Sequence, residues 1–221
     1  MQIPHYTRIH NRFLLNGFSY DRDGLKMVAN SFIKEGDKYE QYLGDFLLDW
    51  LDSSETINLT TSGTTAESKL ICFKKQALVN SAIATGEFFD VNIGDRALHC
   101  LPANFIAGKM MFIRAMILGL ELDLISPSRN PFHKNNKSYD FVAMTPMQAF
   151  HSLANMSQVK VLIVGGAFVS KSLQNALLKT NVRAYETYGM TETLSHIAVR
   201  EMKDPSSEFK CLPYVEVTQD D

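Results

Sequence analysis

The sequence predicts an α/β fold in which mainly parallel sheets are flanked by helices. Two observations lead to this prediction. From residue 57 onward, short apolar runs typical of buried strands alternate with helical patterns, as in chains that build parallel sheets. Hydroxyl- or glycine-rich turns follow the runs that end near residues 59, 164 and 188. Because ligands in such folds bind beyond the carboxyl ends of the strands, these turns are the first candidates for a functional site.

The first 52 residues are expected to form a hairpin and two helices that pack on this core. Asn16-Gly17 suits the positive φ angles of a tight turn, so residues 13–18 predict a small hairpin. Amphipathic patterns predict helices over residues 21–34 and 37–51. We therefore expect two units, residues 1–52 and residues 53–221.

The second unit alternates between strands and helices. Strands are predicted over residues 57–59, 70–73, 97–101, 121–125, 141–144, 159–164, 184–188, 197–200 and 214–218. Helices are predicted over residues 76–89, 109–118, 146–154 and 170–179. Pro146 fits a first helical turn and Ser170 can cap the last helix. The polar residues 126–137, which include two prolines, predict a surface connection.

Composition argues against several classes of function. The 221 residues are 45% hydrophobic and 21% charged, and the net charge of −2 provides no basic field for nucleic acid. The most apolar segment, residues 110–120, is interrupted by Arg114 and is too short to cross a bilayer. Cys72 and Cys100 fall in predicted strands and are expected to be buried thiols, without CxxC spacing. We expect a cytoplasmic protein with neither a nucleic-acid partner nor membrane insertion.

The run from Thr60 to Lys69, TTSGTTAESK, predicts a phosphate-binding loop. It combines backbone N–H groups, several hydroxyls and one mobile cation, which together can hold a polyphosphate. It is not a Walker A motif, because no Gly-Lys-Ser/Thr triplet ends it. A solvated turn would also be rich in these residues, but the unbroken hydroxyl run ahead of Lys69 favours phosphate binding.

Two further turns carry possible ligand contacts. The block Tyr188-Gly189-Met190-Thr191-Glu192 offers an aromatic face for a nucleobase, a hydroxyl for a phosphate and a carboxylate for Mg²⁺. It is equally compatible with a strand end followed by a helix that Thr191 caps. Gly165-Gly166 is by default a tight turn, although its bare backbone could also lie flat against a planar ring. The histidines, His99 and His196 among them, show no metal-ligand spacing.

In this order, the three blocks resemble the adenylate-forming (ANL) superfamily of acyl-CoA ligases, luciferases and adenylation domains. In that family a loop of the type TSGTTGxPK binds the ATP phosphates, and YGxTE contacts adenine, the α-phosphate and Mg²⁺. Here the first block has Ala66 for the usual glycine and Ser68 for the usual proline, whereas the second matches fully. The resemblance implies the N-terminal domain of an adenylate-forming enzyme, with residues 53–221 as its ATP- and acyl-binding core.

The resemblance also implies roles for single residues, with ATP, Mg²⁺ and coenzyme A as cofactor or co-substrates. The implied nucleotide site comprises Thr61, Ser62, Gly63, Thr64, Thr65, Lys69, Gly165, Gly166, Ala167, Tyr188, Gly189, Met190 and Thr191. Within it, Lys69 and the loop hydroxyls would hold the β- and γ-phosphates and Thr191 would meet the α-phosphate. Glu192 would bind Mg²⁺, so the implied catalytic residues are Lys69, Thr191 and Glu192.

A closer resemblance is to the o-succinylbenzoate–CoA ligases of menaquinone biosynthesis. Residues 189–196, GMTETLSH, are similar to the GMTETxSQ block of those ligases, with His196 in place of glutamine. Residues 101–108, LPANFIAG, are similar to the PLFHIxG segment that contributes to their acyl pocket. The implied substrate site comprises Asn104, Phe105, Gly108, Ser195 and His196. An anionic acid would need polar or cationic partners there, for which Ser195, His196 and Lys109 are the candidates.

The implied activity is an acid–thiol ligase: a small-molecule carboxylic acid is adenylated by ATP with release of pyrophosphate, and coenzyme A then displaces AMP. The alternatives are a ligase for a fatty or aryl acid and a nucleotide-binding pseudoenzyme. In the family a ribose-binding aspartate, a hinge and a small lysine-bearing C-terminal domain follow this region. We therefore expect the chain to be the large domain of a longer enzyme, with little turnover by itself. The resemblance also suggests a homodimer.

Overall fold

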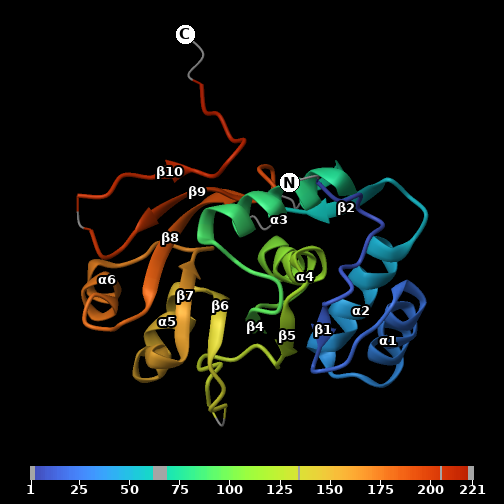
Figure 1. The fold of residues 1–221 in the computed structure, drawn as a ribbon, viewed down its shortest axis with the longest axis horizontal. Coiled ribbons are helices and arrows are strands. Elements are labelled where there is room, and N and C mark those ends of the chain that lie inside the picture. The colour runs from blue at the N-terminus through green and yellow to red at the C-terminus, as the bar shows by residue number, and fades with distance from the viewer. Residues whose placement is uncertain (1–2, 62–68, 134, 205, 219–221) are drawn as a thin grey trace.

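The computed structural model describes residues 3–61, 69–133, 135–204 and 206–218 (Figure 1). Its main feature is an eight-stranded sheet with the order β1-β5-β4-β6-β7-β8-β9-β10. Its strands are β1 (Leu14–Leu15), β4 (Arg96–His99), β5 (Glu121–Leu124), β6 (Tyr139–Met144), β7 (Val159–Val164), β8 (Arg183–Met190), β9 (Ser195–Glu201) and β10 (Lys210–Cys211). Neighbouring strands are parallel from β1 to β8 and antiparallel from β8 to β10. The predicted α/β fold with a mainly parallel sheet is confirmed.

Helices cover both faces of this sheet. They are α1 (Arg22–Glu35), α2 (Lys38–Leu51), α3 (Lys75–Phe89), α4 (Ile106–Leu118), α5 (Pro146–His151) and α6 (Lys171–Leu177), with a 3-10 helix η1 (Leu153–Gln158). In Figure 1, α1 and α2 lie beside the β1 end of the sheet and α5 and α6 lie toward β7 and β8. Helices α3 and α4 pack against each other between these two pairs.

The alternation of side chains along the central strands produces two hydrophobic cores. Phe141 and Val161, which are register partners on β6 and β7, pack with α1 to α4. Their neighbours Val142 and Leu162 point to the opposite face and pack with α5 and α6. Because both faces are buried, these strands read as nearly continuous apolar runs, which is why the sequence located them closely.

The predicted turn at Asn16-Gly17 and the predicted helix cap at Ser170 are confirmed, and the structure adds a cap at Asp21. Asn16 and Gly17 have φ angles of 51° and 84°, as the predicted tight turn requires. The Asp21 carboxylate accepts a hydrogen bond from the backbone N–H of Gly24 and caps α1. The Ser170 hydroxyl likewise accepts from the N–H of Leu173 and caps α6.

Three expectations are wrong. The strands β2 (Thr56–Thr60) and β3 (Leu70–Lys74) form a separate antiparallel sheet, so the loop between them does not follow a strand of the main sheet. Their alternating exposure is typical of a hairpin with one covered face. Cys72 is exposed on β3, whereas Cys100 is buried as expected. No strand forms within the described part of residues 214–218, and Lys210–Cys211 pairs with β9 instead.

The first 52 residues add β1 to the main sheet and the apolar faces of α1 and α2 to one of its cores. A division of the chain after residue 52 remains a prediction. In the part of the chain that the structure describes, none of the helices combines the length and apolar character that crossing a membrane requires.

Candidate functional site

A pocket of about 550 Å³ lies at the carboxyl ends of β4, β6, β7 and β8. It is lined by Leu101, Pro102, Phe105, Ile106, Ala107, Arg114, Ala143, Met144, Thr145, Ile163, Gly165, Gly166, Thr187, Gly189, Met190, Ser195 and His196. Parallel α/β sheets bind ligands at this edge, because the turns that leave the strands diverge there. The pocket is therefore the candidate functional site.

The pocket gathers many of the residues that the sequence pointed to. Those that line it are Phe105, Gly165, Gly166, Gly189, Met190, Ser195 and His196. Those that do not are Asn104, Gly108, Ala167, Tyr188, Thr191 and Glu192. Gly108 supports the wall from behind, since a Cβ there would lie 2.3 Å from the carbonyl oxygen of Pro102. The first turn of α4 can therefore begin directly against the Leu101-Pro102 turn.

The predicted phosphate loop is only partly within the described residues. Ser62, Gly63, Thr64 and Thr65 lie outside them, so their predicted roles remain predictions. The two flanking residues are joined: the N–H of Thr61 donates to the carbonyl oxygen of Lys69 at 2.9 Å, and the N–H of Lys69 donates to Thr61 Oγ1 at 3.0 Å. These two bonds close the hairpin of β2 and β3 at the base of the loop.

The block at residues 188–192 lies at a strand-to-strand turn, so the alternative of a helix that begins at Thr191 is wrong. Strand β8 extends to Met190 and is followed by β9. Thr191 is buried within the turn, and Glu192 is exposed. Leu194 and Ser195 have backbone φ angles of 59° and 97°, values that residues other than glycine rarely adopt. Such strained backbone gathers at functional sites.

Arg114 is the site residue that sequence reasoning missed. It lies on α4 with 1% exposure, yet its guanidinium reaches the pocket. Its Nε donates to Thr85 Oγ1 at 3.2 Å, and its Nη2 donates to Ser195 Oγ and His196 Nδ1, each at 3.3 Å. Among the described residues, no carboxylate forms an ion pair with it. Burial lowers the pKa of Arg114 to about 9.

His196 completes this cluster in a defined protonation state. A guanidinium only donates hydrogen bonds, so Nδ1 of His196 accepts from Arg114 and Nε2 carries the proton. That proton points to Thr85 Oγ1 at 3.4 Å, and the Thr85 hydroxyl donates to the carbonyl oxygen of Ser81 at 2.9 Å. Burial, reinforced by the Arg114 charge, holds the pKa of His196 well below its usual value. The imidazole is therefore neutral.

Lys109, which the sequence offered as a cationic partner for the substrate, does not line the pocket. Its Nζ lies 5.9 Å from the centroid of the Phe46 ring on α2. Burial lowers the pKa of Lys109, and the Asp49 carboxylate partly opposes this shift. The cation that faces the pocket is Arg114.

His99, at the end of β4, supports the pocket from the core side. Its Nε2 donates to the carbonyl oxygen of Gly108 at 3.0 Å and so ties β4 to the first turn of α4. The imidazole is 2% exposed, and burial lowers its pKa from 6.5 to about 4.

We predict that the protein loses stability in mild acid. Below pH 6.5 the imidazole of His99 takes up a proton in the unfolded chain, whereas in the folded chain it stays neutral until the pH nears 4. Its contribution is therefore complete above pH 6.5 and falls by roughly 3 kcal/mol as the pH approaches 4. Urea unfolding at pH 7 and pH 4.5 measures this loss. A His99→Gln variant, which keeps a donor for Gly108, should show a smaller loss; an identical loss would contradict the assignment.

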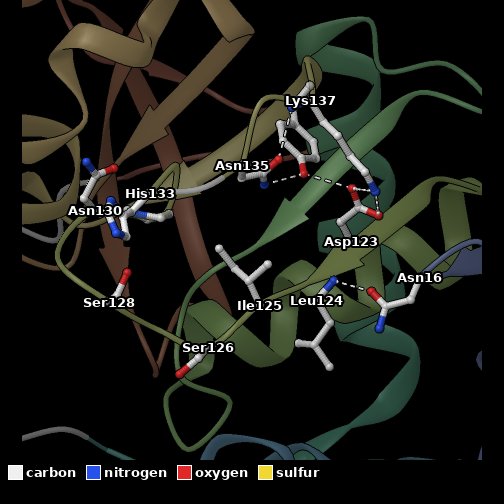
Figure 2. A pocket seen from close by; sticks show the side chains of 12 residues that line it. Asn16, Asp123, Leu124, Ile125, Ser126, Ser128, Asn130, His133, Asn135 and Lys137 are labelled. Atoms are coloured by element: carbon white, nitrogen blue, oxygen red, sulfur yellow. Dashed lines mark hydrogen bonds and ion pairs between the residues drawn. The ribbon is translucent and has the colours of Figure 1, made fainter.

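A second pocket, of about 530 Å³, lies beside β5 and the connection over residues 126–137 (Figure 2). Its two charges neutralise each other, since Lys137 Nζ lies 2.8 Å from Asp123 Oδ2. The hydroxyl of Tyr139 donates to the same carboxylate at 2.9 Å and accepts from Asn135 Nδ2 at 2.8 Å. These groups hold the connection against the sheet, so this pocket is the weaker candidate.

Comparisons with known proteins agree with this geometry. The family of AMP-binding enzymes matches residues 30–217, and the chain therefore belongs to that family. Among solved structures, it is similar to an AMP-forming acyl-CoA synthetase/AMP-acid ligase II-like protein from Dyadobacter fermentans. That likeness has 33% identity and a TM-score of 0.74, over 85% of this chain and 56% of the other.

More distant similarity reaches 2-succinylbenzoate–CoA ligases. The enzyme of Bacillus mycoides is 21% identical over 193 residues, 83% of this chain. The enzyme of Salmonella typhimurium is 25% identical over 143 residues. The chain spans 40% and 31% of the lengths of these two proteins. The Bacillus subtilis o-succinylbenzoate coenzyme A synthetase, solved with ATP and magnesium ion, shares the fold at a TM-score of 0.62 and 21% identity, over 71% of this chain and 35% of the other.

Proposed function

We propose that this chain forms the nucleotide- and acid-binding part of an o-succinylbenzoate–CoA ligase. The observation that carries the proposal is Arg114, a buried guanidinium that faces the pocket without a carboxylate partner among the described residues. Burying an unpaired charge is costly, so a site that keeps one is suited to a ligand of opposite charge.

The number of carboxylates on the candidate substrates distinguishes a diacid from a monoacid, because Arg114 needs an anionic partner. An acid that is adenylated presents one carboxylate to the α-phosphorus of ATP. A fatty or simple aryl acid has no second carboxylate, so it would leave Arg114 unpaired. O-succinylbenzoate carries two carboxylates on an aryl ketone, and its ring can pack against Ile106, Ala143 and Ile163 in the pocket wall. The names of the distant relatives support the same choice.

In the proposed reaction a carboxylate oxygen of the acid forms a bond to the α-phosphorus, and the bond from that phosphorus to the bridging oxygen breaks. Pyrophosphate leaves with the electron pair. In the second step the sulfur of coenzyme A bonds to the acyl carbon, loses its proton, and AMP leaves. The chain contributes positioning and charge neutralisation. Lys69 and the hydroxyls of residues 61–65 would bind the β- and γ-phosphates, and the bare turn at Gly165-Gly166 would lie against adenine.

Glu192 fits the role of a Mg²⁺ ligand. Its carboxylate is exposed at the β8–β9 turn and forms no ion pair with the described residues. Those residues contain no cluster of three or more His, Cys, Asp or Glu. Mg²⁺ in nucleotide sites is commonly held by one or two carboxylates together with phosphate oxygens, so a single exposed carboxylate is sufficient. Bound there, the ion would neutralise charge on the phosphates.

A Glu192→Gln variant should therefore need more Mg²⁺. We expect the Mg²⁺ concentration for half-maximal pyrophosphate release to rise about tenfold or more, equivalent to about 1.4 kcal/mol of metal binding. Titrating Mg²⁺ at saturating ATP measures this shift. Glu208→Gln, an exposed glutamate elsewhere on the chain, is the matched control. Full adenylation by Glu192→Gln at limiting Mg²⁺ would show that Glu192 does not bind the metal.

The function itself is tested by pyrophosphate release from the complete gene product with o-succinylbenzoate and with a panel of fatty and aryl acids. Release with o-succinylbenzoate well above the panel supports the proposal. Release with another acid but not with o-succinylbenzoate would support the proposed reaction with a different substrate. No pyrophosphate release with any acid would favour a nucleotide-binding pseudoenzyme. The 221-residue chain, assayed in parallel, is expected to bind nucleotide weakly and to turn over little.

A further inference from the structure

The Arg114 guanidinium is held from two elements. Thr85 on α3 accepts its Nε–H, and Ser195 and His196 on β9 accept from its Nη2. Thr85, Arg114 and His196 have 0%, 1% and 5% exposure, so solvent does not compete strongly for these bonds. An arginine side chain has many rotamers, and bonds from two directions select one of them.

In each hydrogen bond of this cluster, the chemistry of the groups determines which one donates and which one accepts. Thr85 Oγ1 accepts from Arg114 Nε and from His196 Nε2, and it donates its single proton to the carbonyl oxygen of Ser81. Each group thus uses the donor and acceptor capacity that its chemistry provides. Arg114 keeps its position only if residue 85 has a hydroxyl and residue 196 offers an acceptor on one side and a donor on the other.

The cluster supplies acceptors but no negative charge to Arg114. Among the described residues, the Nη1 atom makes no hydrogen bond, and it is not among the buried atoms that lack a partner. Neutral groups therefore hold Nε and Nη2 in place, while Nη1 and the positive charge of the guanidinium remain free to interact with a ligand in the pocket. A guanidinium held in this way is preorganised to bind a carboxylate.

We propose that Thr85 and His196 are positioning residues that orient Arg114 toward the pocket and thereby set a preference for dicarboxylic acids. The inference rests on the proposed function and deepens it. Thr85 does not line the pocket, so its effect on the acid passes through Arg114, whereas His196 also lines the pocket wall. A helix outside the pocket wall thus contributes to its specificity.

The test compares two acids in the complete gene product. One is o-succinylbenzoate, and the other is 3-benzoylpropionate, which has the same skeleton without the aromatic carboxylate. Thr85→Val should raise the KM for the diacid about tenfold, by loss of one buried charge-assisted hydrogen bond. It should leave the KM for the monoacid and the kcat for both acids nearly unchanged, because Thr85 does not line the pocket. Thr85→Ser keeps the hydroxyl and should behave nearly as the unchanged protein does.

A spectroscopic readout makes the test independent of catalysis. In ¹⁵N spectra of the 221-residue chain, the His196 ring should be neutral and protonated on Nε2 at pH 7, and the Arg114 Nε–H should exchange slowly. Thr85→Val should accelerate that exchange, whereas Thr85→Ser should not. If Thr85→Val does not fold, the inference is still tested by the spectrum of the unchanged chain, which must show the expected His196 protonation and slow Arg114 exchange, and by Thr85→Ser, which must preserve both.

The outcomes separate this inference from the proposed function. Equal losses for both acids, or an imidazole protonated on Nδ1, would overturn the positioning role. An unchanged protein that accepts both acids equally would overturn the diacid specificity, and with it the part of the proposal that depends on that specificity. In that case the exchange measurement would still test the positioning role: if the Arg114 Nε–H exchanges slowly only when residue 85 has a hydroxyl, Thr85 positions the guanidinium.

Discussion

Replacing Arg114 with methionine is expected to raise the KM for o-succinylbenzoate about a hundredfold, equivalent to about 2.8 kcal/mol of binding. The change removes the only cation that lines the pocket within the described residues. Methionine has a similar length and removes a buried charge that has no carboxylate partner among the described residues, but it leaves the acceptors on Thr85, Ser195 and His196 without their donor. Because these two effects oppose each other, the melting temperature should change little while recognition of the diacid is lost.

The effect is measured as KM and kcat for pyrophosphate release, with thermal unfolding alongside. Arg114→Lys should give an intermediate loss, since an ammonium cannot reproduce the planar fork. Arg129→Met, a change at an exposed arginine, is the matched control and should have no effect. An unchanged KM in Arg114→Met would remove the main support for a diacid substrate and would favour a fatty or aryl acid.

Gly189→Ala is expected to destabilise the fold by roughly 3 kcal/mol or more, since overpacking against backbone is poorly relieved. A Cβ at this position would lie 2.1 Å from the carbonyl oxygen of Ser195 and 2.5 Å from the Cα of His196. Both are backbone atoms of the facing strand, and the register of β8 and β9 already shifts between Tyr188 and Gly189. The strands must separate, which displaces two residues of the Arg114 cluster. For a chain of this size the melting temperature should fall by roughly 6 to 12 °C.

Gly166→Ala provides the control for this prediction. No atom lies within 4 Å of a Cβ built at Gly166, although its φ angle is 78°. Its cost is therefore the backbone strain alone, about 1 to 2 kcal/mol. Unfolding by urea and by heat compares the two variants. If they lose the same stability, the close approach of the two strands at Gly189 has no energetic consequence.

The sequence predicted part of the site because that part depends on local chemistry. Gly165-Gly166, Gly189 and Ser195-His196 occupy turns that leave or enter strands, and such turns have recognisable composition. The sheet itself brings these turns to one edge. The roles of Ser195 and His196 at the site were implied by the family resemblance, not by the composition of the turns.

Arg114 was missed because its role depends on packing. The sequence pointed to Lys109, which lies five residues earlier on the same helix. At about 100° per residue, positions five apart point roughly 140° away from each other. Only one of the two can face the pocket. The available signal was the position of Arg114 inside the apolar run 110–118 of that helix. A charged residue is rarely buried unless it has a partner or a function, so this position pointed to a functional role as well as arguing against a membrane span.

The sequence by itself determined the α/β class, the central strands, the cap at Ser170, and the three turns that carry the family resemblance. These follow from hydrophobic periodicity, turn chemistry and local hydrogen bonds, which act over a few residues. Only the tertiary structure decided that β2 and β3 form a sheet of their own, and that Thr85 and His196 meet at Arg114. The partners in these contacts are far apart in the chain, and strand pairing and helix packing alone bring them within hydrogen-bonding distance.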